Sequence, residues 1–286
     1  MKWRRMCLKK CISFIKDNFF IIAEIIVFII IVYALSLVPN TLVEKFSEPT
    51  GFADIFFSII VSCYGKIGIW LIASAMIYGR MRKFNLNLVM NKGNRYHCSC
   101  YCWYWFCSQI LGIKKCNLIL VPIYLQFKLV INEVFEEYPF DEKRFPTRSQ
   151  EEIAVEELVH KITGVNDSEV NLVLEDTYPI VLNQIPEGKR SFFTIKISRN
   201  RPDNIGQRYY SPQFIETIQS IVRNLLDCVT VNVFATTNPV NTRYIAQNAF
   251  QLANRGNIRC LYVYQQSSVG NRDFEPKGHR IYEMNE

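Results

Sequence analysis

The sequence predicts a membrane α-helical hairpin of two transmembrane helices, followed by a cytosolic, three-layer, Rossmann-like α/β domain. Two long apolar segments near the N-terminus carry one charge each. Near the C-terminus, segments typical of strands alternate with segments typical of helices, which is the pattern of a parallel sheet. These observations divide the chain into a two-helix membrane module (1–95), a Cys-rich and aromatic interfacial segment with strands and a linker (96–148), and the cytosolic domain (149–286).

The net charge of +7 is concentrated in the first half of the chain. Residues 1–140 contain 16 Lys and Arg against 8 Asp and Glu, whereas residues 141–286 contain 17 against 18. A basic surplus beside apolar segments indicates contact with lipid headgroups. We therefore expect the lipid bilayer as a partner, and we expect no direct binding of DNA or RNA.

Both apolar segments are long enough to cross a membrane, and their flanks predict the orientation. Residues 18–38 and 55–78 each exceed the roughly 20 residues that span a hydrocarbon core of about 30 Å. The loop between them is short and mostly acidic. The outer flanks are rich in basic residues, namely Lys2, Arg4, Arg5, Lys9, Lys10, Lys16, Arg80, Arg82 and Lys83. By the positive-inside rule we expect a multi-pass protein of the inner cell membrane with both termini in the cytoplasm.

Two charged side chains fall within the predicted spans, Glu24 in the first and Lys66 near the middle of the second. A charge at the bilayer centre costs about 2.5–3.5 kcal/mol on insertion scales, so Lys66 needs a partner or a wet path. Two interpretations remain open. Either these membrane charges line a pore or oligomer interface that the soluble domain opens, or they pair within one chain while Lys66 reaches towards the headgroups.

The segment 96–113 combines four cysteines, a histidine and several aromatic residues, and contains no acidic residue, Lys or Arg. The spacing C-x-C-x-C is too tight for a usual zinc site, so no metal is expected. A third span would be short and would move the C-terminal half outside. An interfacial or buried segment fits best, because Trp103, Tyr104 and Trp105 suit the headgroup boundary. Beyond it, runs at 118–121 and 127–131 look like strands separated near Pro122.

The cytosolic domain shows start signals for three helices. A capping box at Ser149–Glu152 predicts a helix that ends at Gly164. Ser211-Pro212 and Asn238-Pro239 each combine an N-cap residue with a proline at the first helical position. Four apolar runs are expected to be strands, and they occupy residues 170–174, 192–197, 229–235 and 258–264.

In a parallel sheet, ligands bind outside the carboxyl ends of the strands. Arginines, hydroxyls, amides and a helix N-terminus meet at this edge, which suits an anionic ligand such as a nucleotide. An alternative is that such loops are polar anyway and that the Asn before Pro239 only caps a helix. The residues expected to bind the ligand are Arg199, Arg201, Thr236, Thr237, Asn238, Gln265 and Ser267.

Known catalytic motifs are missing from the sequence. It has no G-x-G-x-x-G, Walker loop, G-x-S-x-G or H-E-x-x-H pattern. None of the three histidines, His97, His160 and His279, stands beside a carboxylate pair in the loops named above. The sequence therefore favours a protein that is not an enzyme, and no catalytic residue or cofactor is expected.

The segment from Val229 to Gln265 contains a strand, a small polar turn with Pro239, a helix, and a strand that ends in Tyr262-Val263-Tyr264. This pattern resembles the core of CARF and SAVED sensor domains, which bind cyclic nucleotide messengers. Two transmembrane helices ahead of a cytosolic sensor also resemble membrane effectors of bacterial anti-phage (CBASS-like) signalling. The chain has room for one such unit, so the resemblance implies that a second subunit completes the ligand site.

The leading hypothesis is a membrane effector whose cytosolic domain senses a nucleotide-type ligand and drives oligomerisation or membrane perturbation, in the manner of anti-phage defence. The expected partners are a cyclic nucleotide or other anionic small ligand and further copies of the chain. Two alternatives remain. One is a membrane-tethered scaffold without a small ligand, and the other is a membrane-bound enzyme that acts on a nucleotide or a lipid headgroup.

Overall fold

The computed structural model describes residues 14–37, 52–93, 95–97, 99–150, 152–159, 169–199, 208–225, 229–251, 258–267 and 270–284. In the second long helix, the side chains of residues 52–66 and 69 are not described, so the membrane charge predicted at Lys66 lies outside the described residues. The chain forms two compact units. One comprises residues 1–88 with 110–113, and the other comprises residues 89–109 with 114–286.

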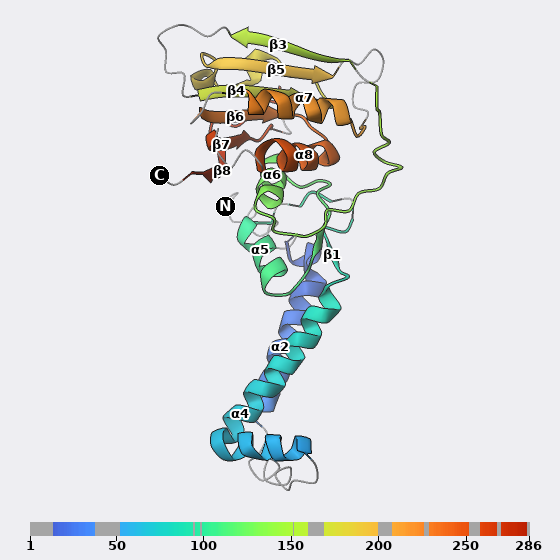
Figure 1. Ribbon diagram of the computed structural model, residues 1–286, viewed down its shortest axis with the longest axis vertical. Coiled ribbons are helices and arrows are strands. Elements are labelled where there is room, and N and C mark those ends of the chain that lie inside the picture. The colour runs from blue at the N-terminus through green and yellow to red at the C-terminus, as the bar shows by residue number, and fades with distance from the viewer. Residues whose placement is uncertain are drawn as a thin grey trace, which may run out of the picture. The chain divides into compact units, whose positions relative to one another are not determined.

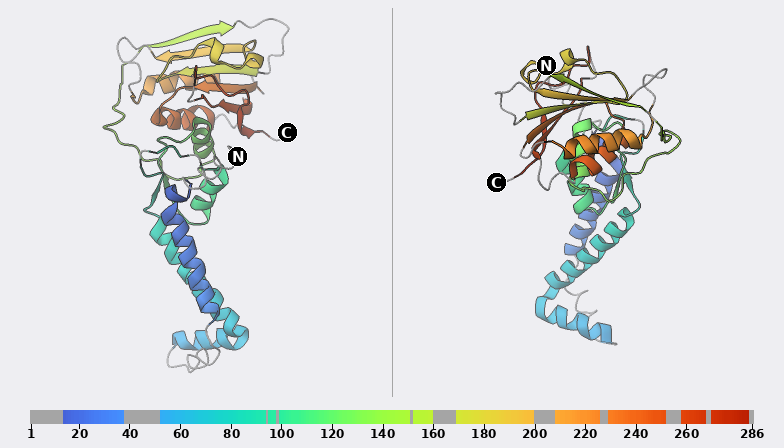
Figure 2. Two further views of the ribbon diagram at one scale, coloured as in Figure 1. Left: turned by 180° about the vertical axis from the view of Figure 1, so that it is seen from behind. Right: turned by 45° about the horizontal axis from the view of Figure 1, so that its top comes forward.

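The first unit contains two long helices, α2 (Phe19–Ser36) and α4 (Phe52–Asn85), which lie side by side (Figures 1 and 2). Trp70 Nε1 on α4 donates a hydrogen bond to the carbonyl oxygen of Val32 on α2 at 2.9 Å. Among the described residues, α2 is the helix that is long and apolar enough to cross a membrane, and none of its residues is buried.

The membrane charge Glu24 has a partner on the other helix. Asn85 Nδ2, at the end of α4, donates to Glu24 Oε1 at 2.9 Å and to the carbonyl oxygen of Leu111 at 3.0 Å. Glu24, near the start of α2, contacts Asn85 at the end of α4. Val32 is later in α2, and its partner Trp70 is earlier in α4, so the two helices run antiparallel. The carboxylate is thus held by an amide within one chain.

The second unit is built on a six-stranded sheet with the order β3-β5-β4-β6-β7-β8. The four central strands are parallel, and the two edge strands are antiparallel to their neighbours. The strands are β3 (Ile153–Val159), β4 (Glu169–Glu175), β5 (Phe193–Arg199), β6 (Val229–Ala235), β7 (Ile258–Tyr264) and β8 (His279–Glu283). The four strands predicted from the sequence are therefore confirmed as the parallel centre of the sheet.

Both predicted cap-and-proline helix starts are confirmed. Helix α7 (Pro212–Arg223) begins after Ser211, whose side chain accepts a hydrogen bond from the backbone N–H of Phe214. Helix α8 (Pro239–Ile245) begins after Asn238 and continues as the π-helix η3 (Ala246–Gln251).

The connections change face where the direction of the chain along the sheet reverses. Helices α7 and α8 pack together on one face and carry the chain from β5 to β6 and from β6 to β7 (Figure 2). The step from β4 to β5 runs the other way. It uses the short 3-10 helices η1 (Leu182–Gln184) and η2 (Glu187–Lys189), whose flanking residues Ile180 and Ile185 pack on the opposite face. Crossovers of one constant hand require this change of face.

The sequence predicted helices on both faces of the sheet. In the described ranges, α-helices cover only one face, and the other face carries the short helices η1 and η2. Its core instead joins sheet side chains to loop side chains: Val173, Phe234 and Tyr264 from the sheet, with Ile180, Ile185 and Phe274. On the helix-covered face, fully buried residues include Leu172, Leu174, Val231, Val233, Leu261 and Val263.

The helix predicted from the capping box at Ser149–Glu152 is wrong. Residues 153–159 instead form β3, which pairs with β5 from Ile153↔Arg199 to Val159↔Thr194. A capping box contributes about 0.5–2 kcal/mol, which a ladder of backbone hydrogen bonds along a whole strand outweighs. The β-branched residues at 153, 155 and 159 also follow the two-residue period of a strand.

The strands predicted around Leu118 and Phe127 are also wrong. Residues 123–131 form helix α6 (Ile123–Ile131), and Pro122 occupies its N-cap position. Seven of its nine residues are buried, so the helix is apolar almost all round. A short apolar run of this kind carries no period that separates a buried helix from a strand.

The cysteine-rich segment folds as helix α5 (Tyr101–Gln109), next to a small sheet of β1 (Val89–Met90) and β2 (Lys115–Cys116). Cys107 and Cys116 are buried, whereas Cys100 and Cys102 are exposed. Burial raises the pKa of the Cys116 thiol well above its ordinary value. Among the described residues, no group of three or more His, Cys, Asp or Glu could hold a metal ion.

The close packing of Gly278 against Tyr264 predicts a sensitive position in the core. A Cβ added at Gly278 would lie 2.8 Å from two ring carbons of Tyr264, and that ring stacks on Phe234 at 4.5 Å. We expect Gly278→Ala to destabilise the protein by about 1–3 kcal/mol, since the ring has no room to move. The measurement is the melting temperature of the full chain in detergent.

Gly188→Ala is the matched control, because a Cβ at Gly188 would meet nothing within 4 Å. We expect its stability to change by less than about 0.5 kcal/mol. Equal melting temperatures for the two variants would show that Tyr264 does not confine residue 278.

Candidate functional site

The strand order places a topological switch point between β4 and β6. From β4 the chain moves outward to β5, then crosses back over β4 to β6 and on to β7. The last paired residues of the two central strands are Leu174 and Ala235, so the loops that follow them start side by side. In open α/β sheets this is where ligands bind. The loops after β4, β5, β6 and β7 therefore form the candidate site.

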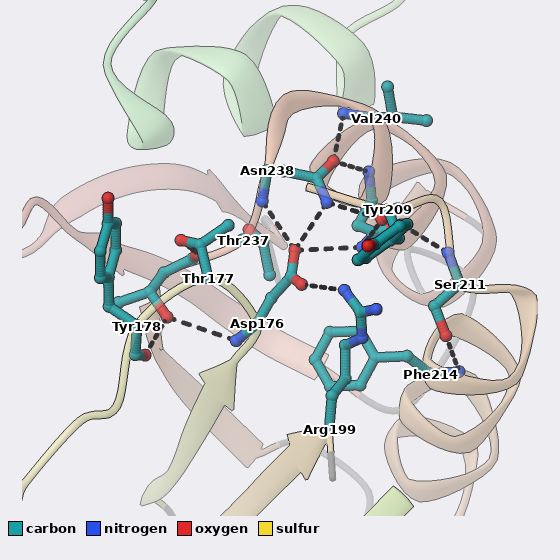
Figure 3. Close-up of polar contacts among 12 residues, drawn as sticks. Asp176, Thr177, Tyr178, Arg199, Tyr209, Ser211, Phe214, Thr237, Asn238 and Val240 are labelled. Atoms are coloured by element: carbon teal, nitrogen blue, oxygen red, sulfur yellow. Dashed lines mark hydrogen bonds and ion pairs between the residues drawn. The ribbon is translucent and has the colours of Figure 1, made fainter. Parts of the chain in front are cut away.

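A buried carboxylate, Asp176, is the centre of this edge (Figure 3). Asp176 Oδ1 forms an ion pair with Arg199 Nη1, and the two side chains are 0% and 1% exposed. Arg199 also lies over the ring of Tyr209, with 5.9 Å from Cζ to the ring centroid. Because both charged groups are withdrawn from water, neither is open to a ligand in this structure.

The second oxygen of Asp176 binds the start of α8. Asp176 Oδ2 accepts hydrogen bonds from the backbone N–H of Asn238 at 2.8 Å, from Asn238 Nδ2 at 2.9 Å and from Asn241 Nδ2 at 3.0 Å. The Asn238 side-chain oxygen caps the helix by accepting from the N–H groups of Val240 and Asn241. The helix N-terminus that was expected to bind an anionic ligand thus already holds an internal anion.

The chain segment before α7 is fixed by the same asparagines. The carbonyl oxygen of Tyr209 accepts from Asn238 Nδ2 at 2.8 Å and from Asn241 Nδ2 at 3.0 Å. Asn241 Oδ1 accepts from the N–H of Ser211 at 3.1 Å. The ring of Tyr209 is also contacted by Arg148, with 5.0 Å from Cζ to the ring centroid. One hydrogen-bonded network therefore joins the ends of β4 and β5, the start of α7 and the start of α8.

Threonines hold the β4 and β6 loops together. The hydroxyl of Thr236 donates to the carbonyl oxygen of Tyr178 at 2.8 Å, and the N–H of Thr177 donates to the carbonyl oxygen of Thr236 at 3.1 Å. The hydroxyls of Thr237 and Thr242 lie 2.7 Å apart. Thr236 and Thr237 are 6% and 8% exposed. Their polar atoms are thus engaged within the fold.

The loop after β7 is attached elsewhere. Gln265 Oε1 accepts from the N–H of Ile123 at 2.9 Å, at the start of α6. The N–H of Ser267 donates to the carbonyl oxygen of Asp273 at 2.9 Å, and the side chain of Ser267 is exposed. Because β7 is adjacent to β6, this loop leaves the sheet at the same edge as Thr236.

The sequence-predicted site residues thus fall into three groups. Arg199, Thr236, Thr237 and Asn238 lie together, and they are buried. Gln265 and Ser267 lie on the neighbouring loop, and Arg201 is outside the described residues. Sequence reasoning missed Asp176, which all of the first group surround. One signal was present, because Asp176 follows the predicted strand at 170–174 by two residues and so stands at its carboxyl end.

A cavity of about 510 Å³ lies away from the strand ends. It is bounded by the end of α5, the segment that follows α6, and η3, with polar lining residues that include Gln109, Glu133, Gln247 and Gln251.

Comparisons with known proteins place the chain in a family. The model of the SMODS- and Ubiquitin system-associated 2TM effector domain matches residues 2–282, and no curated protein matches. Two structures of the Acinetobacter baumannii Cap4 SAVED/CARF-domain containing receptor are similar to this chain. The family match agrees with the resemblance to two-helix effectors of anti-phage signalling that the sequence suggested.

The similarity to the two receptor structures is distant. The structure with the cyclic trinucleotide 3'3'3'-cAAA has 10% identity and a TM-score of 0.36, and the match covers 55% of this chain and 35% of that one. The structure with 2'3'3'-cAAA has 8% identity and a TM-score of 0.40, with 63% and 41% covered. The match therefore spans about two fifths or less of the receptor's length.

The burial of the Asp176–Arg199 pair predicts strong coupling between the two residues. Asp176→Asn or Arg199→Met alone leaves one buried charge unpaired, so we expect each to destabilise the protein by about 3–5 kcal/mol. The double variant leaves no unpaired charge and should lose clearly less than the sum. The measurement is the urea midpoint of the full chain in detergent.

The control is Glu283→Gln, which breaks the exposed ion pair with Arg280, where the side chains are 42% and 60% exposed. Exposed pairs contribute about 0–1 kcal/mol, so this midpoint should barely move. Additive losses in the Asp176 and Arg199 double variant would contradict the coupling.

Proposed function

Because the chain belongs to the SMODS- and ubiquitin-system-associated 2TM effector domain family, we propose that it is a membrane-anchored effector whose α/β unit senses a nucleotide-type ligand. The observation that carries the proposal is the switch point between β4 and β6, because open α/β sheets bind their ligands at such a point. Ligand binding would then drive oligomerisation or perturb the membrane.

The membrane anchor is proposed to be the α2–α4 pair. Helix α2 is apolar and unburied, and α4 packs against it in the antiparallel direction. The 34 residues of α4 amount to about 51 Å of helical rise, more than a hydrocarbon core of about 30 Å requires, and the first part of the helix bends away from the rest (Figure 1). Basic residues precede α2 and lie at the C-terminal end of α4. They support a multi-pass protein of the inner membrane with both termini in the cytoplasm.

We assign the two membrane charges different roles. Glu24 is held by Asn85 in one chain, so it supports a fixed helix pair. Lys66 remains the candidate for a pore or oligomer interface, because a charge near the middle of a span needs a partner or water.

The ligand site is proposed to have a floor and a rim. Arg199, Thr236, Thr237 and Asn238 form the floor, since their burial fixes the loops and leaves few atoms open. Gln265 and Ser267 belong to the rim, together with Arg201, which follows Arg199 by two residues. One α/β unit supplies one such edge, so a second copy of the chain would face it to enclose a ligand.

The burial of the floor also favours the second candidate function, a membrane-tethered scaffold without a small ligand. In that case the network around Asp176 serves only to hold the loops. The two candidates differ in a single measurable property, the binding of an anionic ligand.

Ligand binding is testable on the full chain in lipid nanodiscs. We expect one member of a panel of cyclic di-, tri- and tetranucleotides to bind in calorimetry and to release dye from vesicles that contain the protein. Ser267→Ala, which removes an exposed hydroxyl from the rim, should weaken binding by about 3- to 10-fold, the value of one neutral hydrogen bond. If no member of the panel binds, the scaffold replaces the sensor.

The orientation of the chain is tested by a reporter fused after Glu286. We expect activity of a cytoplasm-dependent reporter and none of a periplasm-dependent one, because basic flanks stay inside. A reporter fused into the loop between α2 and α4 is the control and should behave in the opposite way. Periplasmic activity at the C-terminus would remove the α/β unit from the compartment of the proposed ligand.

A further inference from the structure

An arginine outside the predicted set lies on the switch-point edge. Arg272, in the segment between β7 and β8, lies over the ring of Tyr178, with 4.1 Å from Cζ to the ring centroid. Tyr178 follows β4 by three residues, and its ring points away from the Asp176 carboxylate (Figure 3). The segment that leaves β7 therefore reaches past the end of β6 to the loop after β4.

The position of Arg272 is enforced by the backbone. Its φ is +59°, in the left-handed region that a residue with a side chain adopts only when the surroundings require it. Gln184 Nε2 donates to the carbonyl oxygen of Asn271 at 2.8 Å, and the N–H of Phe274 donates to the carbonyl oxygen of Gln184 at 2.9 Å. Hydrogen bonds on both sides thus fix the turn that carries the guanidinium.

Tyr178 is fixed as well. The hydroxyl of Thr236 donates to its carbonyl oxygen at 2.8 Å, and the next core residue, Ile180, is held by a bond from its N–H to Glu175 Oε2 at 2.8 Å. The ring is partly exposed. It is therefore a stable platform for the arginine.

The guanidinium of Arg272 is charged, exposed and makes no ion pair with any described residue. Stacking uses the flat face of a guanidinium and leaves the N–H donors around its edge in the plane. Those donors match the oxygens of a phosphate, which bind them in pairs. An arginine held in this way loses little conformational entropy when it binds.

We propose that Arg272 binds a phosphodiester group of the ligand and that Tyr178 is the positioning residue that holds it. The proposal rests on the proposed nucleotide-sensing function and adds its phosphate contact. Arg272 and the floor residues lie at the ends of β5, β6 and β7, at one edge of the sheet. The ligand class is a nucleotide with a bridging phosphate.

The test is calorimetry of the full chain in nanodiscs of zwitterionic lipid, with the same panel of cyclic oligonucleotides. Arg272→Ala should weaken binding by about 10- to 100-fold, the range of a lost charge-assisted contact. Arg272→Lys should retain only part of the wild-type affinity, because a lysine ammonium neither stacks on a ring nor forms bidentate hydrogen bonds with a phosphate. Arg280→Ala, at an exposed arginine that pairs with Glu283, is the matched control and should bind as the wild type does.

The role of Tyr178 is tested by two substitutions. Tyr178→Phe keeps the ring and should bind as the wild type does, whereas Tyr178→Ala should approach Arg272→Ala with an unchanged melting temperature. If the wild type binds a nucleotide and Arg272→Ala binds it equally well, this proposal is overturned, while the proposed sensor function stands. If the wild type binds no member of the panel, both proposals fall. If Arg272→Ala weakens binding to vesicles of anionic lipid but leaves nucleotide binding unchanged, then Arg272 binds lipid headgroups and this proposal is overturned.

Discussion

The buried carboxylate of Asp176 holds together the loops after β4, β5 and β6 at the carboxyl edge of the parallel strands. A charge withdrawn from water costs several kcal/mol unless it is paired and hydrogen-bonded, so the surrounding chain must supply partners. Arg199 supplies the opposite charge, and Asn238 and Asn241 supply three N–H donors. Together with Asp176, these residues come from three segments that are far apart in sequence. The shape of the edge therefore depends on one side chain that sequence reasoning did not select.

The reversal of strand order gives this edge its place in the molecule. Because crossovers keep one hand, the step from β4 to β5 lies on one face and the helical steps through α7 and α8 lie on the other. The loops after β4 and β6 start side by side between these connections, and Thr236 joins them. The segment after β7 then reaches Tyr178 through Arg272. The proposed sensor function would use these buried residues as a rigid floor and Arg272 as an adjacent arginine on a fixed turn.

The two-helix unit obeys the same rule on a smaller scale. The first helix, α2, is apolar apart from the carboxylate of Glu24, and Asn85 on the second helix provides its hydrogen bond. Trp70 provides a further link by donating to a backbone oxygen of α2. Polar contacts between apolar helices fix their register, because packing of similar aliphatic side chains specifies it poorly. Each unit thus uses one carboxylate and its hydrogen-bond donors to hold separate segments of the chain in one arrangement.

Local chemistry allowed much of the chain to be predicted. Ser211-Pro212 and Asn238-Pro239 specified two helix starts, because a cap and a fixed φ act within a few residues, and the apolar runs at 229–235 and 258–264 specified strands. Tertiary structure alone decided the rest. Pairing with β5 made residues 153–159 a strand despite a capping box, and burial on most sides made residues 123–131 a helix. It also turned Arg199 and Asn238 inward, since the partner that satisfies them lies at the end of β4, a neighbour in space that no local pattern specifies.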